Sequence, residues 1–95
     1  MSVGVQIDRH IGGEAFILEH KIKAGRVLGQ HSHAHDHLSY LVSGTVELTI
    51  GNEVKDYTAP CCVFVPKNTV HVVAALTDAV WLCVWSTDYL DGDAS

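Results

Sequence analysis

Four histidines alternate with other residues between positions 31 and 37 of the chain. In an extended strand, side chains two residues apart point to the same face, and their α-carbons lie roughly 7 Å apart. Imidazoles spaced in this way can lean onto one ion, and imidazole suits zinc, copper, iron and nickel and also accepts manganese. The run therefore predicts a site for one divalent transition metal (Mn, Fe, Ni, Zn or Cu), with four candidate ligands: His31, His33, His35 and His37.

A histidine-rich segment can also bind metal without any function, or simply remain solvated. The run by itself does not separate these alternatives. The choice depends on the elements that would position it.

Short runs of β-branched and apolar residues predict strands along most of the chain. Glycine comes first in the pair Gly51-Asn52, which favours a two-residue hairpin, and Asn68 tolerates the left-handed conformation of a turn. No segment has the pattern of a long amphipathic helix, so the predicted fold class is all-β, as a sandwich or barrel. The predicted strands are 14–22, 45–50, 53–58, 61–65, 70–76 and 79–86.

The chain of 95 residues predicts a single domain, 1–95, with a core at about 14–86 and an acidic tail at 87–95. The net charge is −5 and the six Lys and Arg residues do not cluster, which argues against nucleic acid or an anionic membrane as a partner. No apolar run reaches the roughly 18 residues of a membrane span, and no signal-peptide pattern is visible, so we expect a cytoplasmic protein. Three cysteines, two of them adjacent, indicate buried free thiols instead of disulfides.

The spacing around the histidine run resembles the first motif of the cupins. That motif has a glycine, five residues, His-x-His, three residues, an acidic residue, six residues and a second glycine. The corresponding positions in this chain are Gly25, His31, His33, His37 and Gly44.

The segment from Pro66 to His71 is similar to the second cupin motif, Pro-x-Gly-x-x-His, with Asn68 in the glycine position. The resemblance covers about residues 24–75 and identifies the chain as a small single-domain bacterial-type cupin of the RmlC-like superfamily. It implies an all-β double-stranded β-helix, or jelly-roll barrel. It also implies one metal ion, held by His31, His33, His37 and His71.

One departure from the motif concerns a ligand, because His37 replaces the acidic residue and makes the implied site all-imidazole. His35 remains the alternative ligand, since a β-bulge would exchange it with His37. Asp36 is a candidate acceptor for a ring N–H of one ligand, with simple solvent exposure as the alternative.

A barrel of this kind needs a pocket lining. In a strand, Trp81, Cys83 and Trp85 point to one face and the residues between them point to the other. One of these two sets of side chains should face the barrel interior. An aromatic core is the alternative to a substrate wall. The candidate lining residues are Tyr40, Phe64, Trp81, Cys83 and Trp85.

The resemblance implies a protein that binds or acts on a small anionic organic molecule. Dioxygenase-like chemistry is favoured, because histidine-only sites resemble those of some cupin dioxygenases. The alternatives are a non-catalytic ligand-binding or sensing cupin, an isomerase or lyase that uses the metal as a Lewis acid, and a purely structural metal. Small cupins commonly form homodimers, sometimes by exchanging N-terminal strands, a part that residues 1–6 are able to play here.

Overall fold

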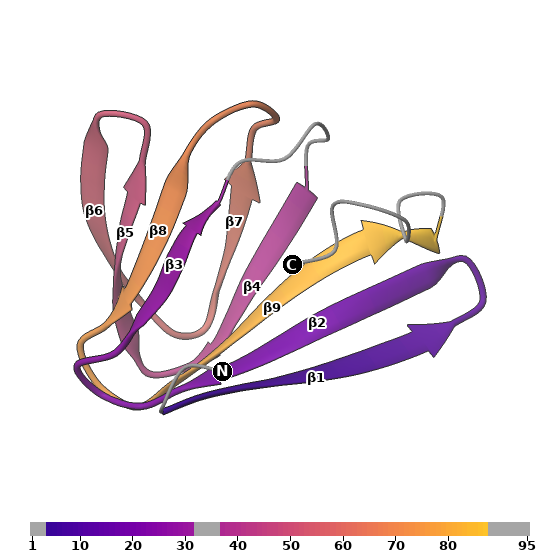
Figure 1. Ribbon diagram of the computed structural model, residues 1–95, viewed down its shortest axis with the longest axis horizontal. Coiled ribbons are helices and arrows are strands. Elements are labelled where there is room, and N and C mark those ends of the chain that lie inside the picture. Colours follow the sequence, from indigo (N-terminus) through magenta and orange to yellow (C-terminus); the bar gives the residue numbers. More distant parts are fainter. Residues whose placement is uncertain (1–3, 32–36, 88–95) are drawn as a thin grey trace.

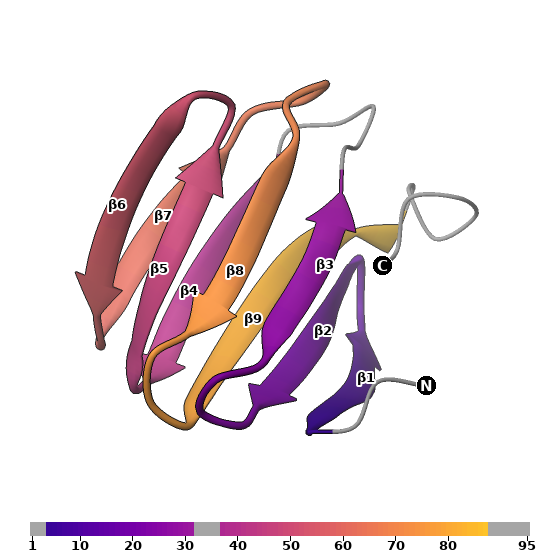
Figure 2. The ribbon, with the colours of Figure 1, turned by 60° about the vertical axis from the view of Figure 1, so that its left-hand side comes forward.

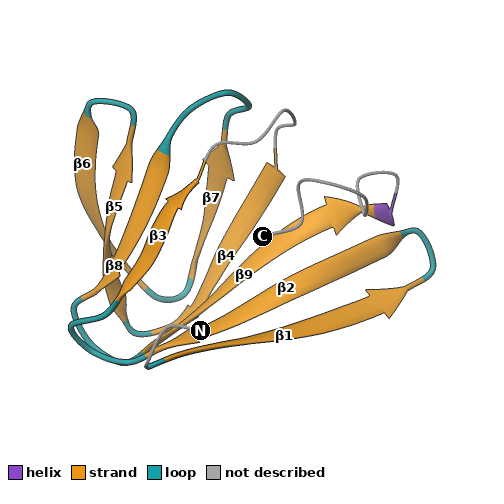
Figure 3. Ribbon diagram, viewed as in Figure 1, coloured by secondary structure: helices purple, strands orange, loops and turns teal. Residues whose placement is uncertain are grey.

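The computed structural model describes residues 4–31 and 37–87, and for residues 30 and 31 it describes the backbone. The described residues form nine strands, and no helix among them is long and apolar enough to cross a bilayer (Figure 3). The strands are β1 (Val5–Gly12), β2 (Ala15–Ile22), β3 (Val27–His31), β4 (His37–Ser43), β5 (Thr45–Ile50), β6 (Glu53–Thr58), β7 (Cys61–Val65), β8 (His71–Ala75) and β9 (Ala79–Ser86).

The strands build two antiparallel sheets that face each other (Figures 1 and 2). One sheet has the order β1-β2-β9-β4-β7 and the other has the order β3-β8-β5-β6. Strands far apart in the sequence are neighbours in both sheets, as in a jelly roll. The apolar side chains of the two inner faces meet between the sheets and form the core. Its largest fully buried apolar members are Trp81, Phe16, Leu18, Ile22, Leu41 and Leu48.

The all-β prediction is confirmed, and most predicted strands have the observed limits. β5, β6, β7 and β9 begin and end where the pattern predicts, whereas β2 starts one residue later and β8 is one residue shorter at each end. In the β5–β6 hairpin Ile50 lies opposite Glu53, and Gly51 has a φ of 58°. Asn68 has a φ of 56°, which explains how asparagine replaces the glycine of the second motif.

β1 is a strand that the sequence analysis did not predict. It pairs with β2 along its whole length, from Val5 opposite Ile22 to Gly12 opposite Ala15. It lies at the edge of the five-stranded sheet and is largely exposed. This strand precedes the predicted core of about 14–86, and the buried apolar residues, from Phe16 to Trp85, all lie inside those limits.

The two motif glycines, Gly25 and Gly44, have φ angles of 83° and 87°, a region that side chains with a Cβ rarely adopt. Their surroundings differ. A Cβ on Gly25 would meet open space, whereas a Cβ on Gly44 would overlap the carbonyl oxygen of Asp78 and come within 2.9 Å of Ala79 Cα. Gly44 is thus required both by its conformation and by the close approach of the β8–β9 turn.

This difference predicts unequal effects of alanine at the two positions. Gly25→Ala should lower the free energy of unfolding by about 1 kcal/mol, the cost of the backbone conformation. Gly44→Ala should cost at least ~3 kcal/mol, since the new methyl group must also displace the β8–β9 turn. Urea unfolding of both variants checks this prediction. Equal losses in the two variants would contradict it.

The barrel has two ends, which differ in the turns and strand termini that they carry. At one end, drawn at the top of Figure 1, lie the β5–β6 and β7–β8 turns, the last residue of β3 and the first residue of β4. At the opposite end lie the β2–β3, β4–β5 and β8–β9 turns. His37 and His71 begin their strands at the first end, and β3 ends there at His31.

Candidate metal centre

His37 and His71 come from opposite sheets and meet inside the barrel. His37 is the first residue of β4 in the five-stranded sheet, and His71 is the first residue of β8 in the four-stranded sheet. Their exposed fractions are 5% and 4%, and their ring centroids lie 5.7 Å apart with the planes tilted by 59°. The fold therefore brings together two predicted ligands that are 34 positions apart in the sequence.

This separation fits two imidazoles on one ion. A metal–nitrogen bond of about 2.1 Å places a ring centroid roughly 3.2 Å from the ion, so two rings on one ion are separated by about 4.5 to 6.5 Å. The observed 5.7 Å falls inside this range. The two side chains need no rearrangement of the strands to act on a common ion.

The hydrogen bond of His71 selects the tautomer that a metal ligand needs. Its Nδ1 lies 3.4 Å from the backbone oxygen of Thr69. A carbonyl oxygen only accepts, so Nδ1 carries the proton and donates it. In the neutral ring, Nε2 then holds the lone pair that binds a metal.

A buried polar chain acts in the same way on His37. The hydroxyl of Ser39 donates to Cys83 Sγ at 3.8 Å, and its oxygen lies 3.2 Å from Nδ1 of His37. With its proton directed at the thiol, the serine oxygen accepts from Nδ1–H, which leaves the lone pair of His37 on Nε2. Ser39 is fully buried, and the sequence analysis missed it. Its even spacing from His37 in a strand was the available signal.

Aromatic side chains of β2 and β9 cover one side of the histidine pair. The ring of Trp85 lies 4.5 Å from that of His37 between centroids, tilted by 33°, and Phe16 stacks on Trp85 at 6.4 Å. Both aromatic residues are buried. This packing restricts the rotation of the His37 ring and keeps water from one of its faces.

The other predicted ligands are described in part or not at all. The backbone of His31 lies directly opposite His71 in the β3–β8 pairing, which places it at the same end of the barrel. His33, the alternative ligand His35 and Asp36 lie outside the described residues. Among the side chains that the structure does describe, no group of three or more His, Cys, Asp or Glu is placed to hold a metal ion.

The predicted pocket lining is corrected at two positions. In β4 and β7 the buried side chains are His37, Ser39, Leu41, Val63 and Val65, so the alternating neighbours Tyr40 and Phe64 point outward. Their exposed fractions are 39% and 58%, and they do not line the barrel interior.

The two alternating sets of side chains in β9 differ in burial, as expected. Trp81, Cys83 and Trp85 are all buried, whereas the residues between them are only partly buried. Trp85 borders the histidine pair, and Cys83 lies one step deeper beside Ser39. Trp81 lies deeper still, where its backbone oxygen accepts from Nδ1 of the buried His20 at 3.2 Å, so it belongs to the core.

The cysteines are free thiols, as predicted, but only one of them is fully buried. Cys83 is buried, Cys61 is partly buried and Cys62 is exposed. Cys62 is exposed because it shares the outward parity of β7 with Phe64. The prediction of buried thiols is therefore wrong for Cys62.

Burial raises the pKa of the Cys83 thiol to about 11, and the hydrogen bonds with Ser39 and Trp81 only partly offset this. The protonated thiol is thus favoured in the folded chain, and its contribution to stability is complete below the unfolded pKa of about 9. As the pH rises from 9 to 11, the free energy of unfolding should fall by about 2 to 3 kcal/mol through this group.

Urea unfolding of the wild type and of Cys83→Ala across this pH range checks the prediction. The wild type should lose the stated amount relative to the variant, because other groups that titrate in this range are common to both chains. Parallel stability curves would contradict a raised pKa at Cys83.

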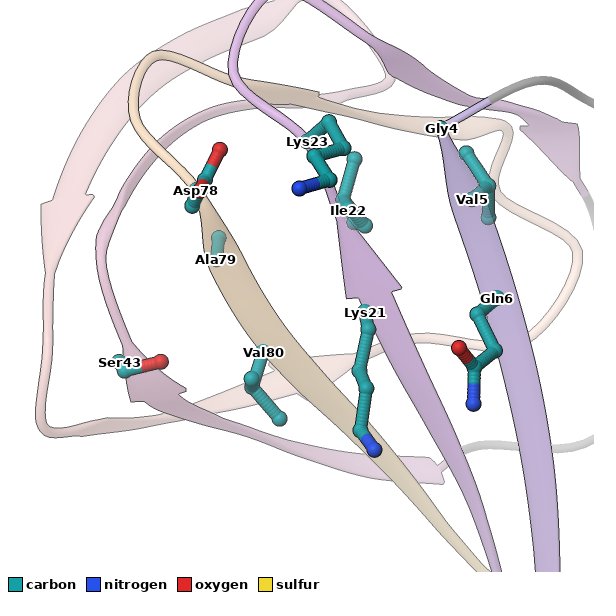
Figure 4. Close-up of a pocket in the computed structure, with 10 residues that line it drawn as sticks. All are labelled: Gly4, Val5, Gln6, Lys21, Ile22, Lys23, Ser43, Asp78, Ala79 and Val80. Carbon is teal, nitrogen blue, oxygen red and sulfur yellow. The ribbon is translucent and has the colours of Figure 1, made fainter.

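A pocket of about 500 Å³ lies at the other end of the barrel (Figure 4). The polar side chains that line it are Gln6, Lys21, Lys23, Ser43 and Asp78. Phe16 and Trp85 stand at the far ends of β2 and β9 from this pocket, so it is separate from the histidine pair. Asp78 already accepts a hydrogen bond at 2.8 Å from the backbone N–H of Ala24, which ties the β2–β3 and β8–β9 turns together.

A jelly roll that holds two motif histidines inside one end of the barrel is typical of a cupin. Residues 18–85 match the cupin domain family, and the chain belongs to this family. The predicted membership and fold are confirmed. A search of curated protein sequences finds no match.

Solved structures agree on the fold. An RmlC-like cupin from Shewanella frigidimarina is 22% identical with a TM-score of 0.82, over 96% of this chain and 83% of its own. KdgF from Halomonas sp. is 24% identical with a TM-score of 0.80, over 90% and 82% of the two chains. The salicylate 1,2-dioxygenase of Pseudoaminobacter salicylatoxidans is 14% identical with a TM-score of 0.79, over 87% of this chain but 25% of its own.

Proposed function

We propose that this cupin binds one divalent transition metal at the end of the barrel that holds His37 and His71, with His31 and His33 as the further ligands. The observation that carries the proposal is the facing pair of buried imidazoles, 5.7 Å apart between centroids. Each ring engages Nδ1 in a hydrogen bond that reserves Nε2 for a metal.

The chemistry of the donors favours an anionic ligand. Four imidazoles are neutral, so a bound ion would keep its full positive charge, whereas the acidic residue of the usual motif would cancel part of it. We infer that the site takes a small organic anion, such as a carboxylate or an enolate. When bound, the ion supplies Lewis-acid polarisation of that anion, or activation of dioxygen beside it.

The side chains around the pair suit such a ligand. Trp85, with Phe16 stacked on it, keeps water from one side of the site. His37 and His71 are fixed by Ser39 and by the backbone of Thr69, so their positions would change little on binding. We expect the protein to act in the cytoplasm on a soluble metabolite.

Dioxygenase-like chemistry is the favoured activity, since a dioxygenase is among the proteins of similar fold and imidazole-only donors suit a redox-active iron. A ligand-binding or sensing role without turnover is the second candidate. An isomerase or lyase that uses the ion as a Lewis acid is the third.

The experiment is a titration of untagged protein loaded with Co²⁺, followed by visible absorption, with acetate, pyruvate and benzoate as probes. A site with open positions should give a saturable spectral change with at least one carboxylate. No change with any of them would indicate a closed, structural site and would contradict the proposal. Oxygen uptake by the Fe²⁺-loaded protein with diketone, flavonol and thiol substrates then separates the dioxygenase from the binding module.

A further inference from the structure

Positive charge is concentrated at the pocket of about 500 Å³ that lies at the opposite end of the barrel from the histidines. Lys21 and Lys23 line this pocket. Arg26 lies at its edge, because a Cβ on the lining residue Gly4 would come within 2.8 Å of Arg26 Cγ and 3.2 Å of its Nε. The chain has a net charge of −5 and only six Lys and Arg residues. Three of them form no run in the sequence, and the fold brings them to one place.

A β-turn holds two of these cations side by side. The backbone N–H of Arg26 donates to the carbonyl of Lys23 at 3.0 Å, which closes a four-residue turn. Gly25 supplies the positive φ, 83°, at the third position of the turn. The α-carbons of the first and last residues of such a turn lie less than about 7 Å apart. Lys23 and Arg26 can therefore present an ammonium and a guanidinium group to the same small ligand.

Hydrogen bonds of the backbone fix this turn to the strands around it. The N–H groups of Lys23 and Gly25 donate to the carbonyls of Gly4 and Ala75, each at 2.8 Å. The carbonyl of Arg26 accepts from the N–H of Ala75 at 2.9 Å. These bonds hold the turn without using the two charged side chains, so a ligand would meet a preformed site.

Two carboxylates lie near the pocket, and they do not balance its three cations. Asp8 lies 3.6 Å from the ammonium of Lys21. Asp78 is the acidic residue among the described lining residues, and its Oδ1 already accepts a backbone N–H at 2.8 Å. In the part of the chain that the structure describes, Lys23 and Arg26 have no carboxylate oxygen within 4 Å. These two cations are available to a ligand with two negative charges.

The rest of the lining suits a small organic molecule. A row of lining residues crosses β1, β2, β9 and β4, each residue opposite the next in the strand register: Gln6, Lys21, Val80 and Ser43 (Figure 4). The amide of Gln6 and the hydroxyl of Ser43 can bond to polar groups of a ligand, and Val80 is a half-buried apolar neighbour. The volume falls within the roughly 300 to 1,000 Å³ of small-molecule sites.

We propose that this pocket binds a small organic phosphate monoester, with the phosphate against the turn formed by Lys23 and Arg26. A phosphate monoester carries close to two negative charges at pH 7 and three acceptor oxygens. Guanidinium binds phosphate through two parallel hydrogen bonds, and ammonium binds it as a point charge. His37 and His71 begin their strands at the other end of the barrel, so this site is independent of the proposed metal centre.

The test is a titration of ¹⁵N-labelled, untagged full chain with phenyl phosphate, followed through the backbone amide signals in two-dimensional NMR spectra. The signals of residues 23–26 should shift and saturate. Lys23→Gln and Arg26→Gln should each raise the dissociation constant at least ~10-fold, because each removes a charge-assisted hydrogen bond. Lys55→Gln is the matched control. It removes the same charge from β6 of the other sheet and should change the dissociation constant by less than about twofold.

Two further probes and one variant test the chemistry of the ligand. Phenol lacks the phosphate and should bind at least ~10-fold more weakly than phenyl phosphate. Asp78→Asn keeps an acceptor oxygen for the backbone N–H but removes a negative charge, so it should tighten binding about threefold. Weaker binding in that variant would contradict the electrostatic argument. Tighter binding of the dicarboxylate phenylsuccinate than of phenyl phosphate would overturn the assignment of the ligand as a phosphate.

The same spectra separate this pocket from the metal centre. His71→Ala should show the wild-type shifts at residues 23–26, whatever its metal content. Shifts confined to residues around His37 and His71, or no saturable shift at all, would overturn the proposal. An equal loss of affinity in Lys55→Gln and in the two turn variants would also overturn it, because binding would then follow the net charge of the chain instead of this site.

Discussion

Replacing His71 with alanine should lower the affinity of the protein for Co²⁺ or Zn²⁺ by at least ~100-fold, since removal of groups that only support a ligand already costs 10- to 100-fold. We expect this loss because His71 is one of the two imidazoles of the pair, the one that belongs to the four-stranded sheet. Its Nδ1–H is held by the Thr69 carbonyl, so its Nε2 is the donor that the variant lacks. Isothermal titration calorimetry on untagged protein measures the change.

Two control variants separate ligand loss from a general loss of structure. His20→Ala removes a histidine that is as deeply buried but belongs to the core beside Trp81, and His10→Ala removes an exposed one. Both should keep the wild-type metal affinity while they remain folded. Metal binding that survives in His71→Ala would place the site on the histidine run alone and would refute the barrel-enclosed site proposed here.

Restoring the usual acidic ligand at position 37 should keep the metal but weaken anion binding. A glutamate beside the ion would cancel part of its charge, so His37→Glu should bind azide and acetate at least ~10-fold more weakly than the wild type. The measurement is a visible-absorption titration of the Co²⁺-loaded proteins. Loading is first confirmed by elemental analysis of each sample.

The matched control for this charge effect is His37→Gln, which changes the shape of the ligand without adding charge. It should weaken metal binding, but any metal-loaded fraction should keep the anion affinity of the wild type. If His37→Glu bound azide as tightly as the wild type or more tightly, the argument from an all-imidazole site would fail.

Much of the fold was predictable because a strand with one buried face alternates apolar and polar residues in the sequence. β5 alternates apolar and polar residues, and its turn needs a positive φ at Gly51, so both strand and hairpin were visible. β1 was missed for the opposite reason. It is an edge strand, largely exposed, and Arg9 interrupts the apolar series of Ile7 and Ile11, which leaves no clear periodic signal.

The candidate site was predictable only for the residues that the spacing of the two motifs identifies. The distance from Gly25 to His37 and the second motif ending at His71 identified two residues that the fold does place together. Ser39 was not singled out, because even spacing from a histidine does not mark a serine as functional until the fold shows its side chain buried beside the ring. Tyr40 and Phe64 were misassigned because residue type suggested a pocket, whereas strand parity decides which face a side chain takes.

The central claim is that one metal ion binds per chain through both cupin motifs. Elemental analysis of protein purified without a histidine tag, then dialysed against a weak chelator, tests this claim most directly. We predict close to one equivalent of a divalent transition metal in the wild type and almost none in His71→Ala. A wild type without bound metal, or a variant that retains a full equivalent, would contradict the account.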